Sequence, residues 1–277
     1  MKIIKKISEI NQIVSDLKKK EKEINLVPTM GNIHEGHLSL LSEAEKFKGV
    51  NIVSIFVNPA QFNDVDDFNN YPNTFIEDVE ILSKKKCDII FAPNKNEIFL
   101  EDIKTKKTVF EYRNILCDLF RLGHFDGVTT IVKILLDLIR PSNVFFGEKD
   151  FQQLKIIEQL INQNNSKTFL IKCPSIRDSN GMSLSSRYSV FSQDQRIKFE
   201  QYAKIINSNL LILKKNFNKK AIDNIENELR NFGISKIDYI EVRNEKDLSL
   251  SKIHERSRLF IALYLDEIRV IDNFVLY

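Results

Sequence analysis

The first half of the chain alternates helix-like and strand-like hydrophobic patterns. Between residues 3 and 20, apolar residues recur at the spacing of one helix face, which predicts an amphipathic helix. Short apolar runs at residues 24–27, 50–57 and 87–91 predict strands, with helical patterns between them. The run VNIVSIFV at 50–57 has no polar face, as is typical of a strand covered by helices on both sides. Strands and helices in this order predict a parallel sheet with right-handed crossovers.

Local signals mark where these helices begin and end. Glycine is a common residue at the end of a helix. The helix that follows the predicted strand at 24–27 is therefore expected to end near Gly49. Thr74 and Glu77 have the spacing of a capping box, which predicts the start of the next helix at this point.

The pattern of alternating elements continues toward the middle of the chain. We predict an apolar helix over 128–139, a buried strand over 143–146, a helix over 151–164 and a strand over 168–172. Between residues 94 and 122 the pattern is irregular, and it indicates only a short strand near 108–110 and a helix near 114–120.

The character of the sequence changes near Pro174. Two long polar helices, over 193–215 and 221–232, come before three strand-like runs at 237–242, 258–265 and 268–271. Helices followed by strands predict a small α+β domain. We therefore expect an α/β architecture: a Rossmann-like parallel-sheet domain over residues 1–174, and a smaller α+β domain over residues 175–277 that packs over the first.

Composition excludes several classes of protein. The chain has 277 residues, of which 43% are hydrophobic, and this predicts a globular protein. Its 41 basic and 38 acidic residues nearly cancel, so charge does not predict nucleic acid or a membrane as a partner. No segment has the roughly 18 apolar residues of a membrane span. Three cysteines without a CxxC pair suit a reducing compartment and predict a cytoplasmic protein with cysteines as packing residues.

The segment LVPTMGNIHEGHL at residues 26–38 is the first candidate for chemistry. It predicts a strand, a turn and a helix start that carries His34 and His37. Unpaired backbone N–H groups and the helix dipole make such a helix start an anion site, with phosphate as the natural ligand. Two alternatives remain open: the histidines cap a surface helix, or they form half of a metal site, although no cysteine or acidic cluster with ligand spacing lies beside them.

Two further polar turns follow predicted strands. Gln61 lies in NPAQF after the run at 50–57, at the edge of the sheet where open α/β folds bind ligands. Lys149 and Asp150 lie in FGEKDF, where the lysine can meet phosphate charge. Each residue also has a structural alternative: Gln61 satisfying loop carbonyls, Asp150 capping the following helix, and Lys149 as a solvated surface charge.

The common nucleotide-binding and hydrolase motifs are absent. The sequence contains no P-loop, no GxGxxG after a strand, no HExxH and no GxSxG. The run HEGH instead resembles the HxGH signature of the nucleotidylyl transferase superfamily. Five strings in this order, PTMGNIHEGH, SIFVNPAQF, GHFDGVTTIV, FGEKDFQQL and LSSR, resemble the pantothenate synthetase (pantoate–β-alanine ligase) family, with a weaker echo at residues 269–273.

This resemblance implies an ATP-dependent ligase of pantothenate biosynthesis, on the pathway to coenzyme A. Pantoate and ATP would give pantoyl adenylate and pyrophosphate, and β-alanine would then displace AMP to give pantothenate. ATP is a substrate and Mg²⁺ is expected to accompany it, held mostly by phosphates and water. The resemblance further implies a homodimer, with ATP and pantoate bound by the domain over residues 1–174 and a lid formed by the domain over residues 175–277. Neither nucleic acid nor a membrane is expected as a partner, because the charges nearly cancel and no apolar segment is long enough for a membrane span.

The resemblance also assigns roles to residues of this chain. His34 and His37 would bind the triphosphate, with His37 as the candidate proton donor, and Lys149 would be a phosphate cation. Gln61 and Gln153 would hold pantoate and β-alanine. Asp150 would bind through the ribose, and residues 185–187 would form a phosphate-binding flap. The full set of implied ATP contacts is Met30, Gly31, Asn32, Ile33, His34, Glu35, Gly36, His37, Gly147, Glu148, Lys149, Asp150, Ile176, Leu184, Ser185, Ser186 and Arg187.

The chain departs from the family pattern at positions that carry no assigned chemistry: Asn73, Leu122, Asp126, Asn180 and Tyr188. Two rival functions stay open on the sequence. One is another HxGH nucleotidylyl transferase that acts on a phosphorylated acceptor, which would need extra cations where this chain has glutamines. The other is a non-catalytic nucleotide- or RNA-binding protein, which the absence of a basic stripe disfavours.

Overall fold

The chain divides into two compact units. The computed structural model describes residues 1–63, 68–99, 109–164, 167–215, 219–251 and 256–277. Unit 1 comprises Met1–Arg113, Arg121–Glu148 and Gln153–Pro174, and unit 2 comprises Asn114–Phe120, Lys149–Gln152 and Ser175–Tyr277. The two short segments that belong to unit 2 come from the middle of the chain, where the hydrophobic pattern does not separate them from unit 1.

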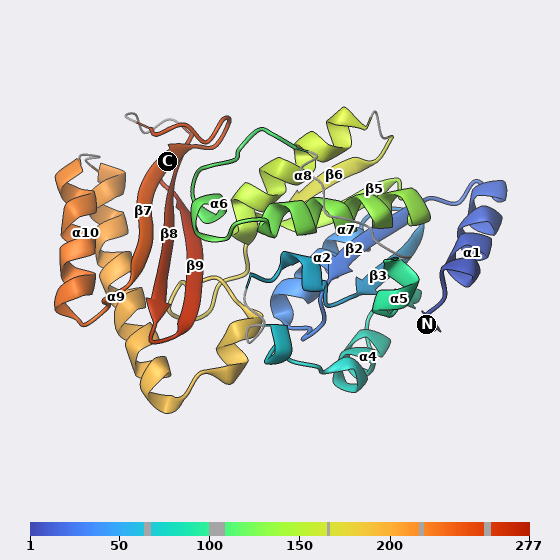
Figure 1. Cartoon of the computed structure of the whole chain (residues 1–277), viewed down its shortest axis with the longest axis horizontal. Coiled ribbons are helices and arrows are strands. Elements are labelled where there is room, and N and C mark those ends of the chain that lie inside the picture. Colours follow the sequence, from blue (N-terminus) through green and yellow to red (C-terminus); the bar gives the residue numbers. More distant parts are fainter. Residues whose placement is uncertain (64–67, 100–108, 165–166, 216–218, 252–255) are drawn as a thin grey trace. The chain divides into compact units, whose positions relative to one another are not determined.

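Unit 1 contains a six-stranded parallel sheet in the order β1-β4-β3-β2-β5-β6, which confirms the predicted α/β fold class. Strands β2, β3, β5 and β6 of this sheet are labelled in Figure 1. In chain order the strands are β1 (Lys2–Ile4), β2 (Ile24–Thr29), β3 (Val50–Ile55), β4 (Ile89–Phe91), β5 (Asn143–Gly147) and β6 (Phe169–Cys173). The helices are α1 (Ile7–Lys19), α2 (Glu35–Ala44), α4 (Phe75–Ser83), α5 (Lys95–Ile98), α7 (His124–Ile139) and α8 (Phe151–Gln163), of which the first two residues of α8 belong to unit 2.

The central strands are buried on both faces, as their continuous apolar sequences predict. Val27, Val53 and Phe145 come from three neighbouring strands and pack in one cluster with residues of α2 and α4. Leu26 and Ile52 point to the opposite face and are fully buried as well. Because successive strand residues alternate between faces, helices must cover both sides of the sheet.

Three asparagines form a buried ladder across the beginning of the central strands. Asn25 of β2 pairs in register with Asn51 of β3 and with Asn143 of β5. Its side-chain amide donates to Asn51 Oδ1 at 3.0 Å, and its own Oδ1 accepts from Asn143 Nδ2 at 2.9 Å. A one-residue slip would move these polar groups to the other face of the sheet, so the ladder helps to set the register.

Several boundaries differ from those predicted. Residues 2–4 form strand β1, which pairs with β4, instead of the start of the first helix. Helix α2 ends at Ala44, before the predicted end near Gly49. Gly49 has φ +129°, and a Cβ there would lie 2.5 Å from the carbonyl oxygen of Glu23, so a tight turn follows the helix. Val109 and Phe110 are not in a strand, and residue 108 lies outside the described residues.

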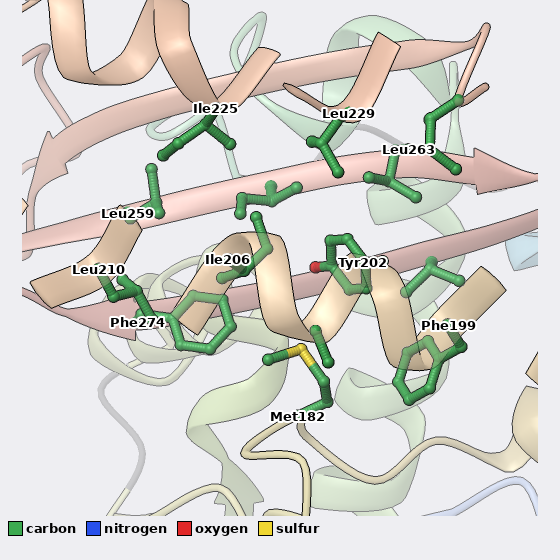
Figure 2. Packing of buried hydrophobic residues seen from close by; sticks show 14 of the residues in the cluster. Met182, Phe199, Tyr202, Ile206, Leu210, Ile225, Leu229, Leu259, Leu263 and Phe274 are labelled. Carbon is green, nitrogen blue, oxygen red and sulfur yellow. The ribbon is translucent and has the colours of Figure 1, made fainter. Parts of the chain in front are cut away.

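Unit 2 contains an antiparallel sheet of β7 (Ile237–Asn244), β8 (Ser257–Leu265) and β9 (Ile268–Val275), as the three strand-like runs predict. Helices α9 (Gln193–Lys215) and α10 (Lys219–Asn231) lie on one side of this sheet (Figure 1). Ile206 from α9, Ile225 from α10 and Leu259 from β8 meet in one buried cluster (Figure 2). The short helix α6 (Cys117–Phe120) also belongs to this unit.

The three cysteines are free and buried. Burial raises the pKa of Cys87 to about 11 and the pKa of Cys173 to about 12, so both thiols are uncharged at neutral pH. The Cys117 sulfur lies 3.0 Å from the hydroxyl oxygen of Tyr239. Within the described part of the chain, no helix combines the length and the apolar composition needed to cross a bilayer.

The asparagine ladder leads to a prediction for stability. Replacing Asn25 with alanine leaves the Asn51 carbonyl and the Asn143 amide without their buried partner. We expect the free energy of unfolding to fall by about 2 to 3 kcal/mol. Urea denaturation measures this change. The control is N11A, at an exposed position of α1, which should change stability by less than about 0.5 kcal/mol. A ladder variant as stable as the control would contradict the assignment.

Candidate active site

A buried carboxylate holds the turn between β2 and α2. Asp78 of α4 accepts hydrogen bonds from the backbone amides of Asn32 at 3.0 Å and Ile33 at 2.7 Å. The turn exposes these amides to Asp78 because Gly31 and Asn32 have positive φ angles, +83° and +50°. A Cβ at position 31 would lie 2.8 Å from Asp78 Oδ2. The glycine therefore provides both the left-handed conformation and the space for the carboxylate.

Asp78 and Thr74 act together, and this contact corrects the prediction of a capping box. The Thr74 hydroxyl accepts from the Asn32 amide at 3.1 Å and lies 3.2 Å from Asp78 Oδ2, to which it donates. Thr74 is the N-cap residue of α4, so the predicted helix start is confirmed, but its side chain makes no cap there and the predicted capping box is wrong. Burial raises the pKa of Asp78, while the hydrogen bonds from Ile33, Asn32 and Thr74 oppose that effect.

The two histidines of the turn cap α2 through one nitrogen each. His34 is the N-cap residue, and its Nδ1 accepts from the Gly36 amide at 3.0 Å. The Nδ1 of His37 accepts from the His34 amide at 3.4 Å, and the two ring centroids are 4.2 Å apart. A nitrogen that accepts a hydrogen bond carries no proton, so each neutral ring carries its proton on Nε2. The cap of α2 therefore uses only the Nδ1 atom of each ring.

Gln61 lies at the end of the short 3₁₀ helix η1 (Pro59–Gln61), after β3. Its side-chain amide donates to the sulfur of Met30 at 2.8 Å, and its Oε1 accepts from Asn58 Nδ2 at 3.1 Å. The Gln61 side chain therefore contacts the first residue of the histidine-bearing turn. Two segments about 30 positions apart in the sequence meet here because β2 and β3 are neighbours in the sheet.

Residues at and just before the start of α7 bind the backbone of Gln61. His124 Nδ1 lies 2.7 Å from the Gln61 carbonyl oxygen, and Arg121 donates to the same oxygen at 3.3 Å. A Cβ at Gly127 would lie 2.2 Å from the carbonyl oxygen of Ala60, so only glycine allows this close packing. The GHFDG segment, expected before the helix, forms its first turn and positions the loop that carries Gln61.

Residues at which the chain departs from the family pattern have structural partners. Asp126 forms an ion pair with Arg113 at 2.9 Å, and the Arg113 side chain is only 4% exposed. The Asn180 carbonyl accepts from Asn207 at 2.6 Å, and the Tyr188 ring packs 4.5 Å from the ring of Phe199. The side chains of Asp126 and Tyr188 thus have partners within the fold, whereas the Asn180 contact uses its backbone carbonyl.

The strand order places two turns next to each other. Strand β2 pairs with β3 on one side and with β5 on the other. The chain runs from β2 to β3 and returns later to β5, so the direction of strand succession reverses at β2. Open α/β sheets bind ligands at such a switch point, outside the carboxyl ends of the strands. The histidine-bearing turn follows β2 and the turn with Gly147 and Glu148 follows β5, so both lie at this edge.

In unit 2, the remaining predicted residues form two local groups. Lys149 Nζ lies 3.5 Å from Asp150 Oδ1. The Leu184 amide donates to the Ile176 carbonyl at 3.0 Å, which closes a turn. Ser185 is the N-cap of the 3₁₀ helix η3 (Ser186–Val190), and its Oγ accepts from the Arg187 amide at 3.3 Å. The phosphate-binding residues expected in this segment therefore begin a short helix.

Some of the predicted site residues contact one another, whereas for others the structure gives only the position and the exposure. Within unit 1, His34 contacts His37 and Gln61 contacts Met30. Glu35 is exposed at the start of α2, and Gln153 is half-buried in the first turn of α8. In the described ranges, no three histidine, cysteine or carboxylate side chains gather into a group that could hold a metal ion.

Comparison with known proteins decides the family. The family model described as pantoate-beta-alanine ligase matches residues 2–275. The chain belongs to the pantoate-β-alanine ligase family. It is 35% identical over 280 residues to pantothenate synthetase of Caldicellulosiruptor bescii, with 99% of each chain covered. It is 38% identical to pantothenate synthetase of Endomicrobium trichonymphae, with 100% of this chain and 98% of the relative covered.

Solved structures of the pantoate-β-alanine ligase family show the same fold. Pantothenate synthetase of Thermus thermophilus has a TM-score of 0.92 at 28% identity, with both chains fully covered. Pantoate-β-alanine ligase of Francisella tularensis has a TM-score of 0.86 at 32% identity, covering 100% of this chain and 98% of that one. The chain is thus an enzyme, a ligase of pantoate and β-alanine, and the resemblance is confirmed. The match over the whole chain favours neither rival function.

Sequence reasoning missed Asp78, although the sequence carries a signal for it. Asp78 occupies a core position of α4, on the face that also bears Phe75, Val79 and Leu82. A carboxylate at an apolar position of an amphipathic helix must have buried partners. The pattern could therefore have indicated a structural acid, but not that its partners are backbone amides 45 residues away.

The role of Asp78 can be tested by an isosteric change. In D78N, an NH2 group replaces one of the two carboxylate oxygens and faces the N–H of Asn32 or Ile33. Two donors then face each other, and that backbone amide loses its acceptor. We expect the rate of the ligase reaction to fall about 10- to 100-fold because the histidine-bearing turn shifts. Steady-state kinetics on folded protein measures this. The control is E77Q, at the exposed neighbouring residue. Equal activities of the two variants would show that Asp78 does not hold the turn.

Proposed function

We propose that this ligase works in two steps through an acyl adenylate. In the first step, a carboxylate oxygen of (R)-pantoate attacks the α-phosphorus of ATP. An O–P bond forms, the bond to the β-phosphate breaks, and pyrophosphate leaves. In the second step, the amine of β-alanine attacks the acyl carbon, the bond to AMP breaks, and the nitrogen loses a proton to give pantothenate. A carboxylate needs this activation because its own oxygen is a poor leaving group.

The observation that carries the proposal is the histidine pair at the start of α2. The two rings lie at the positive end of the α2 dipole, which would attract an anion at the switch point of the sheet. The structure of the Francisella tularensis relative is described as complexed with beta-gamma ATP and β-alanine, which supports ATP as the substrate of this chain. Donors that are already oriented stabilise charge that develops on the α-phosphate during the attack.

Other residues of unit 1 would bind the ends of the reactants. We assign the turn from Met30 to His37, with Gly147 and Glu148, to ATP. Gln61 and Gln153 would hold the acid substrate, since an amide side chain can donate to its carboxylate and accept from its hydroxyls. The contacts of Gln61 with Met30 and Asn58 favour one orientation of its amide, which leaves donor and acceptor capacity in defined directions.

Unit 2 would contribute a second set of nucleotide contacts. Lys149 supplies a positive charge for phosphate, and Asp150 is assigned to the ribose. Ser185, Ser186 and Arg187 start a 3₁₀ helix and would bind phosphate oxygens, with Ile176 and Leu184 beside the nucleotide. The role of residues 175–277 as a lid stays a prediction.

Magnesium would enter with ATP. Mg²⁺ prefers oxygen ligands and usually keeps several waters, bound through substrate phosphates. The described residues offer no cluster of three ligating side chains, and both Asp78 oxygens accept backbone amides. These residues fit an ion held mainly by phosphates and water, whose chemistry is to neutralise phosphate charge. Titration of the ligase rate with Mg²⁺ at fixed ATP tests this.

Location and assembly are proposals as well. Three free cysteines, all buried, support a cytoplasmic location, because disulfides are rare in reducing compartments. The homodimer rests on the resemblance to the family. Cell fractionation tests the first, and light scattering of the purified chain tests the second, where a mass of 32.3 kDa would contradict the dimer.

The two-step mechanism is tested by isotope exchange. Purified protein should exchange labelled pyrophosphate into ATP only when pantoate is present, because the first step is reversible and needs the acid. Free AMP should accumulate only after β-alanine is added. Exchange that proceeds without pantoate would contradict the proposed substrate, and AMP release without β-alanine would contradict the order of steps.

The assigned donors are tested by alanine substitutions. H37A and K149A should each lower pantoate-dependent exchange about 100-fold or more, the usual effect of removing one oriented donor to transition-state charge. The control is K198A, which removes a lysine of unit 2 whose ion pair with Asp266 lies on an exposed surface. A folded variant with normal exchange would remove that residue from the site.

A further inference from the structure

Two consecutive residues of β9 bind the turn that precedes the Leu184–Arg187 segment. Asp272 Oδ2 accepts from the Ser183 amide at 2.8 Å and from Arg177 Nη1 at 3.2 Å. The Nη2 atom of Arg177 donates to the Asn273 carbonyl at 2.6 Å. Asp272 and Asn273 are only 3% and 2% exposed. The two ends of the turn, residues 177 and 183, are therefore both attached to the same step of the strand.

The turn itself is closed by its own hydrogen bonds. Asp178 Oδ1 accepts from the amides of Asn180 at 2.9 Å and Met182 at 2.8 Å. Arg177 Nη1 also donates to the Gly181 carbonyl at 2.9 Å. These hydrogen bonds hold residues 177–183 in one conformation. Because Leu184 follows Ser183 directly, the attachment of the turn to β9 helps to position Leu184 and the residues after it.

The side chain of Asn273 contacts the backbone of Lys149, a residue that the proposed function assigns to ATP. Its Nδ2 donates to the Lys149 carbonyl at 2.7 Å, and its Oδ1 accepts from Arg258 Nη1 at 2.6 Å. Because a guanidinium can only donate and a carbonyl can only accept, these partners decide which way the amide points. Arg258 also stacks 4.2 Å from the ring of Phe151, which fixes its own position.

We propose that Asp272 and Asn273 are positioning residues that hold Lys149 and the Leu184–Arg187 segment in one frame for the phosphates of ATP. The inference rests on the proposed function insofar as it assigns those residues to ATP. Neither β9 residue needs to touch substrate. Burial raises the pKa of Asp272, and the positive charges of Arg177 and Lys149 act against this effect, so both cations lie within electrostatic reach of its carboxyl group.

Isosteric variants separate this role from simple stability. N273D keeps the size of the side chain and the acceptor for Arg258, but it sets an oxygen against the Lys149 carbonyl. D272N turns one of two accepting oxygens into a donor, so either Ser183 or Asn273 loses the acceptor of its amide. The matched control is D238N, which weakens another buried aspartate–arginine pair of the same sheet, Asp238 with Arg269 at 2.8 Å.

The expected kinetic result is specific to ATP. N273D and D272N should lower the maximal rate of pantoate-dependent pyrophosphate exchange about 10-fold or more and raise KM for ATP, while KM for pantoate stays within twofold. D238N should lower the melting temperature without this kinetic change. If N273D keeps wild-type exchange, or if D238N shows the same kinetic change, the positioning role is overturned.

Hydrogen exchange of the ligand-free protein provides a readout that does not depend on the reaction. The Ser183 amide or the Asn273 amide, whichever faces the new NH2 group, should exchange about 10-fold faster in D272N than in the wild type, and both should exchange at the wild-type rate in D238N. Unchanged exchange of both amides in D272N would overturn the inference. If the wild type shows no pantoate-dependent pyrophosphate exchange, the proposed function fails, and these two amides alone then decide whether Asp272 holds the turn.

Discussion

The pairing of β2 with β3 on one side and β5 on the other is the interaction on which the candidate site of unit 1 depends. Parallel strands in register bring their carboxyl ends to one edge, so the turns after these three strands are neighbours whatever their distance in the sequence. The ladder through Asn25 opposes a slip of register at the other end of the strands. The cost of unpaired buried amides thus helps to fix the edge where ligands bind.

At that edge, Asp78, His34 and His37 provide hydrogen-bond partners for the backbone amides at the start of α2. A helix start leaves backbone amides without partners, and an anion site needs donors that face outward. Asp78 takes the amides that point inward, and the Nδ1 atoms of His34 and His37 take those of the first helical turn. Each ring thus uses only its Nδ1 atom for the cap.

Unit 2 uses buried polar side chains in a similar way, but to fix loops instead of a helix start. Asp272 and Asn273 have almost no exposed surface, and besides two arginine side chains they bind backbone atoms of the turn before Leu184 and of Lys149. Buried polar groups of this kind must be satisfied, so they accept only one arrangement of their partners. A ligase that handles two anionic reactants benefits from cations that are held in place before ATP binds, because less ordering remains for the reaction.

The sequence by itself determined the alternation of strands and helices, the parallel class of the first sheet and the strings that carry the family resemblance. These depend on local periodicity and on short motifs, which a single chain displays directly. It placed His34, Gln61 and Lys149 at the ends of strands for the same reason. Only the tertiary structure decided that Thr74 serves the Gly31–Ile33 turn instead of its own helix, that residues 2–4 pair as a strand, and that β9 binds Lys149. Each of these outcomes rests on hydrogen bonds between segments 42 to 124 positions apart, and spacing along the chain carries no record of such partners.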